Sequence, residues 1–229
     1  MKTPLVIIIM GPPGSGKGTQ AFLLAEKFNL YRLETSKIIE KNLLNIKKND
    51  FVVVNGKKYS LFKEKKLRQS GKWMDPPLIT VWVKNKIREL VKEGKGIALD
   101  GSPKTLYEGK ELTPLLKKLY GASNIKIILI KQRPEVSIWR NSKRRICELM
   151  RHSILYTKET AKLKTCPLDG SKLVSREDSD PEVIRGKLKE FKERTLPLVD
   201  YFKKEGFKIN EVDGEKSVSD VFNDILKAL

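Results

Sequence analysis

The 229-residue sequence has only two cysteines, one histidine and no long hydrophobic run. Two cysteines cannot form the disulfide framework of a small secreted protein, and no Ser/His/Asp arrangement surrounds the single histidine. No stretch approaches the roughly 20 apolar residues that cross a bilayer. The apolar run Leu5 to Met10 lacks a signal-peptide cleavage site and leads into a glycine-rich segment. We therefore expect a cytoplasmic protein without a membrane partner.

Acidic residues are also scarce relative to basic ones. The chain has 47 Lys and Arg against 28 Asp and Glu, a formal net charge of +19, while 39% of its residues are hydrophobic. That apolar fraction permits a packed core and makes wholesale disorder a poor description. The positive charge fits a solvated lysine-rich surface, a cleft that holds several phosphates, or a nucleic-acid or acidic-lipid partner. We favour the solvated surface, and the length fits one large domain with one or two insertions.

Three apolar runs without polar alternation predict buried parallel strands, namely Leu5 to Met10, Gly96 to Leu99 and Ile125 to Ile130. Segments with helical spacing of apolar residues lie between them, including Thr19 to Phe28 and Leu78 to Val91. The order β-α-α-β-α-β predicts an α/β fold with a doubly wound parallel sheet.

Two polar segments, 41–75 and 147–179, interrupt this order, and we interpret both as insertions that project from the core. The dipeptide Asn55-Gly56 lies between β-forming residues in the first segment. Because both residues accept positive φ, this dipeptide predicts a hairpin over residues 50–60.

The C-terminal part of the chain has clear helix signals. Asp180 followed by Pro181 is typical of a helix N-cap and first turn, and we predict a helix that runs towards Arg194. Gly206 to Ile209 predicts a weak final strand, and Ser217 to Leu229 a capped closing helix.

The strongest functional signal is the segment Gly11-Pro12-Pro13-Gly14-Ser15-Gly16-Lys17-Gly18-Thr19. It follows a predicted strand and opens a predicted helix, and its Gly-x-x-x-x-Gly-Lys spacing matches a phosphate-binding loop. The glycines allow backbone N–H groups to approach an anion, the helix start adds its positive dipole end, and the lysine adds a mobile charge. An ordinary Gly/Pro turn is the alternative that this context disfavours.

The variant Gly-Pro-Pro-Gly-Ser-Gly-Lys-Gly-Thr-Gln resembles the adenylate kinase family of nucleoside monophosphate kinases. Further matches follow in the family's order: Leu99-Asp100-Gly101-Ser102-Pro103-Lys104-Thr105, Arg144-Arg145-Ile146-Cys147, Arg176-Glu177-Asp178 and Val212-Asp213-Gly214-Glu215-Lys216. The resemblance implies a P-loop NTPase fold in which helices flank a five-stranded parallel sheet. The implied core is 1–34, 76–141 and 180–229, with an inserted NMP-binding domain at 35–75 and an inserted lid domain at 142–179.

The resemblance also implies a donor site. The residues it assigns to the ATP phosphates are Gly14, Ser15, Gly16, Lys17, Gly18 and Thr19. It assigns Arg140 and Lys216 to the adenine side, and Arg144, Arg176 and Lys187 to the transferred phosphoryl group, as catalytic residues with Lys17 and Asp100. Asp100 is expected to hold Mg²⁺ through water, because it ends a strand beside the loop, whereas a turn cap is the alternative. For Arg140 and Arg144, which share a helix face at i and i+4, the alternative is a solvated basic surface.

The acceptor segment departs from the family pattern. Thr35 fits, but Glu40 stands where family members have an arginine, so that Lys37 or Lys41 must serve the acceptor phosphate or the acceptor is held differently. Lys104 replaces a second arginine and keeps the charge without the bidentate fork. Glu108 stands at the position of an adenine-reading glutamine, and a carboxylate only accepts hydrogen bonds. Trp73 resembles the acceptor-site loop and is a candidate contact for the acceptor base.

The insertion 142–179 contains four candidate metal ligands: Cys147, His152, Cys166 and Asp169. Two thiolates, an imidazole and a carboxylate suit tetrahedral Zn²⁺ with no open position, as in structural sites. Some adenylate kinases have a zinc knuckle that begins Arg-Arg-Ile-Cys, although the second cysteine of its usual pair is Met150 here. A metal-free lid and a disulfide between the two cysteines are the alternatives.

These observations predict reversible phosphoryl transfer from Mg·ATP to AMP, giving two ADP, by a monomeric enzyme. The same chemistry with CMP, UMP or GMP is the nearest alternative, because Glu40, Lys104 and Glu108 depart from the family pattern. A basic RNA-associated protein with a residual nucleotide site is the alternative from another class. We disfavour nucleic acid as a partner, since the sequence has no aromatic-rich RNA-binding signature.

Overall fold

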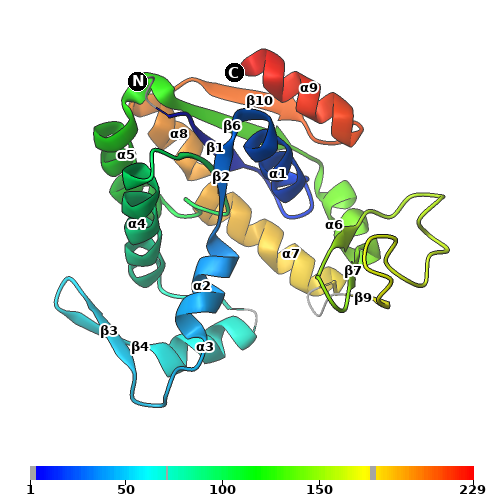
Figure 1. The fold of residues 1–229 in the computed structure, drawn as a ribbon, viewed down its shortest axis with the longest axis horizontal. Coiled ribbons are helices and arrows are strands. Elements are labelled where there is room, and N and C mark those ends of the chain that lie inside the picture. The colour runs from blue at the N-terminus through cyan, green and yellow to red at the C-terminus, as the bar shows by residue number, and fades with distance from the viewer. Residues whose placement is uncertain (1–3, 71, 176–178) are drawn as a thin grey trace.

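A parallel five-stranded sheet forms the centre of the computed structural model, which describes residues 4–70, 72–175 and 179–229 (Figure 1). The strands are β1 (Val6–Met10), β2 (Leu30–Glu34), β5 (Gly96–Asp100), β6 (Ile125–Lys131) and β10 (Ile209–Asp213). Their order is β10-β6-β1-β5-β2, and every neighbouring pair is parallel. The predicted α/β fold with a five-stranded parallel sheet is therefore confirmed.

Helices cover both faces of the sheet, which explains why its strands are apolar without alternation. From β1, Ile7 and Ile9 pack into one cluster with the first and last helices of the chain, whereas Val6 and Ile8 pack into the opposite cluster. The two covering sets are α1 (Lys17–Phe28) with α9 (Val218–Ala228), and α4 (Pro76–Lys92) with α5 (Leu106–Tyr120) and α8 (Pro197–Lys204). Residues of β1 that point either way are thus fully buried.

The segment after β2 leaves the sheet and returns at α4. It forms α2 (Thr35–Leu43), the antiparallel hairpin of β3 (Phe51–Val54) and β4 (Lys57–Ser60), and α3 (Leu61–Gln69). Asn55 and Gly56 have φ of 49° and 77°, as a two-residue hairpin loop requires, so the predicted hairpin is confirmed. A separate apolar cluster, which includes Tyr59 and the buried Trp82 of α4, fixes this segment to the core.

A second excursion follows α6 (Pro134–Lys143). It contains a three-stranded antiparallel sheet of β7 (Arg145–Cys147), β8 (Ser153–Ile154) and β9 (Leu173–Ser175). The short helix η1 (Ala122–Asn124) lies earlier in the chain, between α5 and β6. Its apolar cluster consists of four buried residues, Cys147, Ile154, Cys166 and Leu173, with Leu163 packed against them. Such a small core contributes little stability by itself, so we expect that a cross-link is needed to stabilise this excursion.

The helix predicted from Asp180 begins as expected but does not run regularly to Arg194. The Asp180 side chain accepts hydrogen bonds from two backbone N–H groups, and Pro181 occupies the first turn of α7 (Pro181–Glu190). A π-helical turn, η2 (Phe191–Thr195), then replaces the α-helix, with Leu196 N donating to Phe191 O at 2.8 Å. Pro197, which cannot donate an N–H and crowds the preceding turn, accounts for this irregularity.

The final strand lies three residues later than predicted. Gly206, with a φ of 85°, terminates α8, and the buried Phe207 ring packs edge-on against Phe202 with centroids 6.0 Å apart. These residues belong to the helix end, so β10 begins only at Ile209. The closing helix agrees with its prediction, with Ser217 as its N-cap. Within the described residues, no helix combines the length and apolar character needed to cross a bilayer.

Candidate nucleotide site

The glycine-rich loop joins the carboxyl end of β1 to the start of α1, the position at which open α/β sheets bind ligands. Gly16 is the residue before α1 and has a φ of 88°, a conformation that side chains other than glycine rarely adopt. The Lys17 ammonium folds back over the loop and donates to Pro12 O at 2.7 Å. The loop thus presents the start of a helix and a lysine, the requirements for an anion site.

The electrostatic setting of Lys17 is unusual for a lysine. Its pKa is lowered from 10.5 to about 8, mainly by burial; the charge of Asp100 opposes this shift, and the nearby charges of Lys104 and Arg144 add to it. Charges from two parts of the chain, the segment Asp100 to Lys104 after β5 and the end of α6, therefore act on one ammonium group. A phosphate placed there would relieve the repulsion among these cations.

Asp100 does end β5 as predicted, but its carboxylate already has a cationic partner. Arg32 Nη2 lies 2.7 Å from Asp100 Oδ2 and 3.1 Å from an oxygen of Glu34. Arg32 comes from β2, which the sequence analysis did not identify as a strand. Alternation at i and i+2 puts Arg32 and Glu34 on the same face of that strand, and this spacing is the signal that was available.

The loop after Asp100 is held by a buried polar network. The peptide bond between Ser102 and Pro103 is cis, and Thr35 donates to the Ser102 hydroxyl at 3.0 Å. Glu108 is only 3% exposed, and its carboxylate accepts from Ser102 at 3.1 Å and from the Lys104 N–H at 3.0 Å. Burial raises the pKa of Glu108. Glu108 thus fixes the loop, and its expected contact with an acceptor base stays a prediction.

The Lys104 side chain of this loop lies near an aromatic ring and a second cation. Its ammonium lies 5.8 Å from the centre of the Trp73 ring, and the Arg194 guanidinium lies 5.5 Å from the centre of the same ring. Burial lowers the pKa of Lys104. The carboxylates of Glu108 and Asp100 oppose this shift, and the charges of Lys187 and Arg68 add to it. The Trp73 ring and several cations are thus gathered on one side of the loop.

Glu40 is ion-paired, and its partner was not predicted. Arg68, from α3, contacts the Glu40 carboxylate at 2.8 Å. Lys37, which we had considered as a substitute for the missing arginine, instead contacts Glu34 at 2.7 Å. The positive charge that offsets Glu40 therefore comes from a different helix, a relation that spacing within α2 could not reveal.

The predicted donor-side arginines lie at the base of the second excursion. Arg140 donates to the carbonyl oxygens of Gly214 and Glu215, at 2.7 and 3.3 Å, and so ties α6 to the predicted adenine-side loop. Lys216, in that loop, is paired with Asp224 at 2.7 Å. Arg144 donates to the Ser153 hydroxyl at 2.6 Å. The charge of Lys187 helps to lower the pKa of Lys104. The predicted residues Arg176, Glu177 and Asp178 lie outside the described residues.

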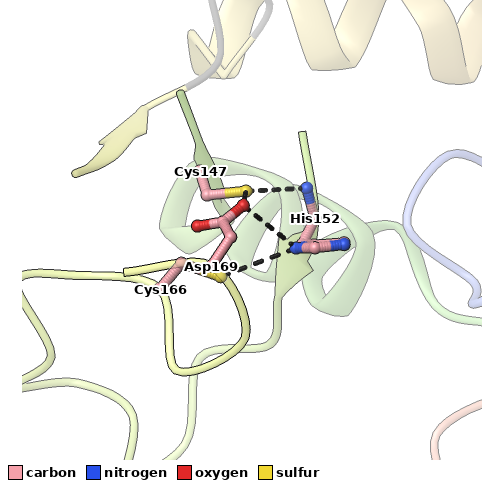
Figure 2. A group of neighbouring side chains, drawn as sticks. All are labelled: Cys147, His152, Cys166 and Asp169. Carbon is pink, nitrogen blue, oxygen red and sulfur yellow. Dashed lines mark hydrogen bonds and ion pairs between the residues drawn. The ribbon is translucent and has the colours of Figure 1, made fainter. Parts of the chain in front are cut away.

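The four candidate metal ligands come together within the second excursion (Figure 2). One ligand atom from each of Cys147, His152, Cys166 and Asp169 lies within 4.8 Å of all the others. His152 Nδ1 lies 3.3 Å from the Asp169 carboxylate and 3.6 Å from Cys166 Sγ. Both cysteines are free, so the disulfide alternative is not realised.

Hydrogen bonds pre-organise this cluster. The Cys147 thiol donates to Asp169 at 2.9 Å, and the Ser171 N–H and hydroxyl donate to the other carboxylate oxygen at 3.0 and 2.7 Å. These donors hold the pKa of Asp169 well below its usual range, and burial raises the pKa of the Cys166 thiol. Two sulfurs, an imidazole nitrogen and a carboxylate oxygen are all ligand atoms that Zn²⁺ accepts.

The parallel sheet, the lysine-bearing loop and the surrounding cations define a P-loop nucleoside monophosphate kinase. A family model for adenylate kinase matches residues 9–207. Adenylate kinases of Caldanaerobacter subterraneus and Methanothrix thermoacetophila are 34% and 32% identical to the chain, over 97% of its length and 95% and 97% of theirs. That of Borreliella burgdorferi is 30% identical over 97% of both chains. The chain belongs to the adenylate kinase family.

Proposed function

We propose that the protein transfers the terminal phosphoryl group of Mg·ATP reversibly to AMP, giving two ADP. The observation that carries this proposal is the convergence on Lys17. The charges of Asp100 and Lys104, from the segment that follows β5, and of Arg144, at the end of α6, all act on its ammonium. Phosphoryl transfer needs two phosphate groups in line, neutralised charge and exclusion of water, and little covalent help from the protein.

In the proposed reaction the ATP phosphates bind the N–H groups of the loop that includes Gly14, Ser15, Gly16, Gly18 and Thr19. Lys17 exchanges the Pro12 carbonyl for a phosphate oxygen, whose negative charge opposes the lowering of its pKa by burial and by the neighbouring cations. Arg140 and Lys216 flank the adenine, while Arg144, Arg176 and Lys187 surround the transferred group. Closure of the lid over both nucleotides excludes water, which would otherwise take the phosphoryl group.

Mg²⁺ fits the proposed site through Asp100. The Asp100 carboxylate acts electrostatically on Lys17, which places a hard oxygen ligand at the phosphate end of the site. When bound with ATP, Mg²⁺ supplies charge neutralisation of the phosphates. We propose that Asp100 holds Mg²⁺ through water. The ion pair between Asp100 and Arg32 affects this binding, because both cations need the same carboxylate.

For the acceptor, we propose that Lys104 and Thr35 lie on the phosphate side, with the Trp73 ring available to the base. Lys104 is a point charge, so the site lacks the bidentate fork of an arginine at this position. The assay that tests the function is coupled detection of ADP formed from ATP with AMP, CMP, UMP or GMP, each at equal concentration. Preference for AMP supports the proposal; preference for another monophosphate supports the alternative acceptor, and no product with any of them contradicts both.

We further propose that Cys147, His152, Cys166 and Asp169 bind a structural Zn²⁺. The support is the donor set, its preformed hydrogen bonds and the very small apolar cluster around it. A closed four-ligand site supplies cross-linking energy and leaves no position for catalysis. The matching test is elemental analysis of protein purified without chelators.

The remaining proposals concern organisation. We propose a core of 1–34, 76–141 and 180–229, an NMP-binding domain of 35–75 and a lid of 142–179, consistent with the two excursions from the sheet (Figure 1). We also propose that the enzyme acts as a monomer in the cytoplasm, where its nucleotide substrates are abundant. Light scattering of the purified protein tests the first of these two points.

A further inference from the structure

Arg32 joins two carboxylates at the edge of the nucleotide site. Its Nη2 atom lies 2.7 Å from Asp100 Oδ2 and 3.1 Å from Glu34 Oε2. Glu34 also contacts Lys37 at 2.7 Å. Because β2 and β5 are adjacent and parallel, a side chain from β2 can reach the carboxyl end of β5. The guanidinium therefore fills the space between two acids that would otherwise repel each other.

This ion pair lies next to the first turn of α1, the helix that carries Lys17. A Cβ atom added at Gly18 would lie 3.0 Å from Arg32 Nη2 and 3.2 Å from Asp100 Oδ2. Gly18 follows Lys17 in the first turn of α1. Arg32 is thus a direct neighbour of the site in which the triphosphate and its metal ion are proposed to bind.

A guanidinium and a divalent cation compete for this carboxylate. Both need its oxygens, and like charges at contact distance repel each other strongly in a partly buried site. The position of Arg32 is also incompletely satisfied, because its Nε is buried without a hydrogen-bond partner among the described residues. Arg32 is therefore not as fully bonded in this position as a permanent structural arginine usually is.

We propose that Arg32 is a positioning residue that serves as a built-in counter-cation of Asp100, so that Mg²⁺ interacts with Asp100 only after Arg32 releases it. This inference rests on the proposed Mg·ATP reaction. In the nucleotide-free protein the guanidinium keeps divalent cations from the pair formed by Asp100 and Glu34. The phosphates of incoming ATP offer it another anionic partner, so metal and nucleotide enter together.

The test is titration of nucleotide-free protein with Mn²⁺, followed by electron paramagnetic resonance of the free ion. Arg32→Gln removes the competing charge and should bind Mn²⁺ at least about tenfold more tightly than wild type, since the two carboxylates lose their counter-cation. Arg32→Lys keeps the charge and should behave like wild type. The double variant Arg32→Gln/Asp100→Asn should lose the gain, and Arg133→Gln, which removes an exposed arginine from its ion pair with the half-buried Glu215, should show none.

The inference is overturned if Arg32→Gln binds Mn²⁺ as wild type does while its circular dichroism and ATP affinity are unchanged. A second measurement needs no substitution at Arg32. Asp100→Asn should leave Mn²⁺ binding to the nucleotide-free protein unchanged, because Arg32 already occupies that carboxylate, and a tenfold loss would contradict the proposal. Neither titration involves a nucleotide, so their failure is distinct from a failure of the wild-type enzyme to form ADP.

Discussion

The Arg68 guanidinium contacts the Glu40 carboxylate at 2.8 Å, across the gap between α3 and α2. A guanidinium has five N–H donors, and this contact uses only one of its nitrogens. The charge of Arg68 also helps to lower the pKa of Lys104, whose ammonium lies near the Trp73 ring. The arginine that the resemblance led us to expect at position 40 is thus matched by an arginine that arrives from α3.

Replacing Arg68 by Leu should therefore weaken binding of the acceptor. We expect KM for AMP to rise by about 10- to 100-fold, the loss of one or two charge-assisted hydrogen bonds, with KM for ATP nearly unchanged. Initial rates measured with each substrate varied at saturation of the other give both constants.

Arg88→Leu is the matched control, because Arg88 is exposed on α4 and, among the residues that the structure describes, hydrogen-bonds through its side chain only to Asn85 of the same helix. It should alter neither constant. An Arg68→Leu enzyme with the wild-type KM for AMP, or with equal losses for both nucleotides, would contradict a role for Arg68 at the acceptor.

The lowered pKa of Lys17 predicts a specific pH dependence of ATP binding. With a pKa of about 8 in the free protein, the lysine is largely neutral above that pH, and a bound phosphate raises its pKa again. Binding then takes up a proton, so ATP affinity should fall as the pH rises above 8, by up to about tenfold per unit. Calorimetry in two buffers of different ionisation enthalpy measures this proton uptake.

The same group has the opposite effect on folding. Between pH 8 and the unfolded value of 10.5, the unfolded chain binds more protons than the native state, so the contribution of Lys17 to the free energy of unfolding rises with pH.

Lys17→Met should abolish the proton uptake that accompanies ATP binding. If wild-type protein takes up no proton on binding ATP at pH 9, the assigned setting of Lys17 is wrong.

The lid cluster predicts about one zinc ion per chain. Removing it with a chelator, or replacing Cys166 by Ser, should lower the melting temperature, because the apolar cluster around the ligands is too small to hold the excursion together. Leu168→Ala, at an exposed position in the same turn, should leave the metal content unchanged. Protein prepared without chelators that contains no stoichiometric zinc rules out the proposed site.

Glu108 allows structural and recognition roles to be separated. Glu108→Ala leaves the Ser102 hydroxyl and the Lys104 N–H without their buried acceptor, and should destabilise the fold by about 2–3 kcal/mol. Glu108→Gln keeps an acceptor oxygen for both, so its melting temperature should change little. If position 108 also reads the base, Glu108→Gln should sharpen the preference for AMP over other monophosphates; an unchanged preference assigns Glu108 to the loop alone.

The features that the sequence predicted well are those encoded by contiguous residues. The run before Gly11, the loop that ends at Lys17 and the turn at Asn55-Gly56 each contain the signal for their own conformation. Cys147, His152, Cys166 and Asp169 are not contiguous, yet they lie together as the zinc-knuckle resemblance at Cys147 led us to expect, whereas the metal they would bind stays a prediction.

The features that were missed depend on contacts between distant segments. Strand β2 is an edge strand with charged residues, so it lacks the continuous apolar run of its neighbours, and the Arg32 partnership with Asp100 was missed with it. The Arg68 pairing joins separate helices. The helix after Asp180 was predicted without its π turn, because the breaker, Pro197, lies beyond the residues where the irregularity occurs.

That π turn has a structural consequence. Helix α7 begins where the lid excursion ends, and at the far end of the turn the Thr195 hydroxyl donates to the backbone oxygen of Lys104 at 2.8 Å. The helical segment α7 and η2 therefore connects the end of the second excursion directly to the loop after β5. This connection does not pass through the central sheet, so the two regions that flank the nucleotide site share one continuous helical element.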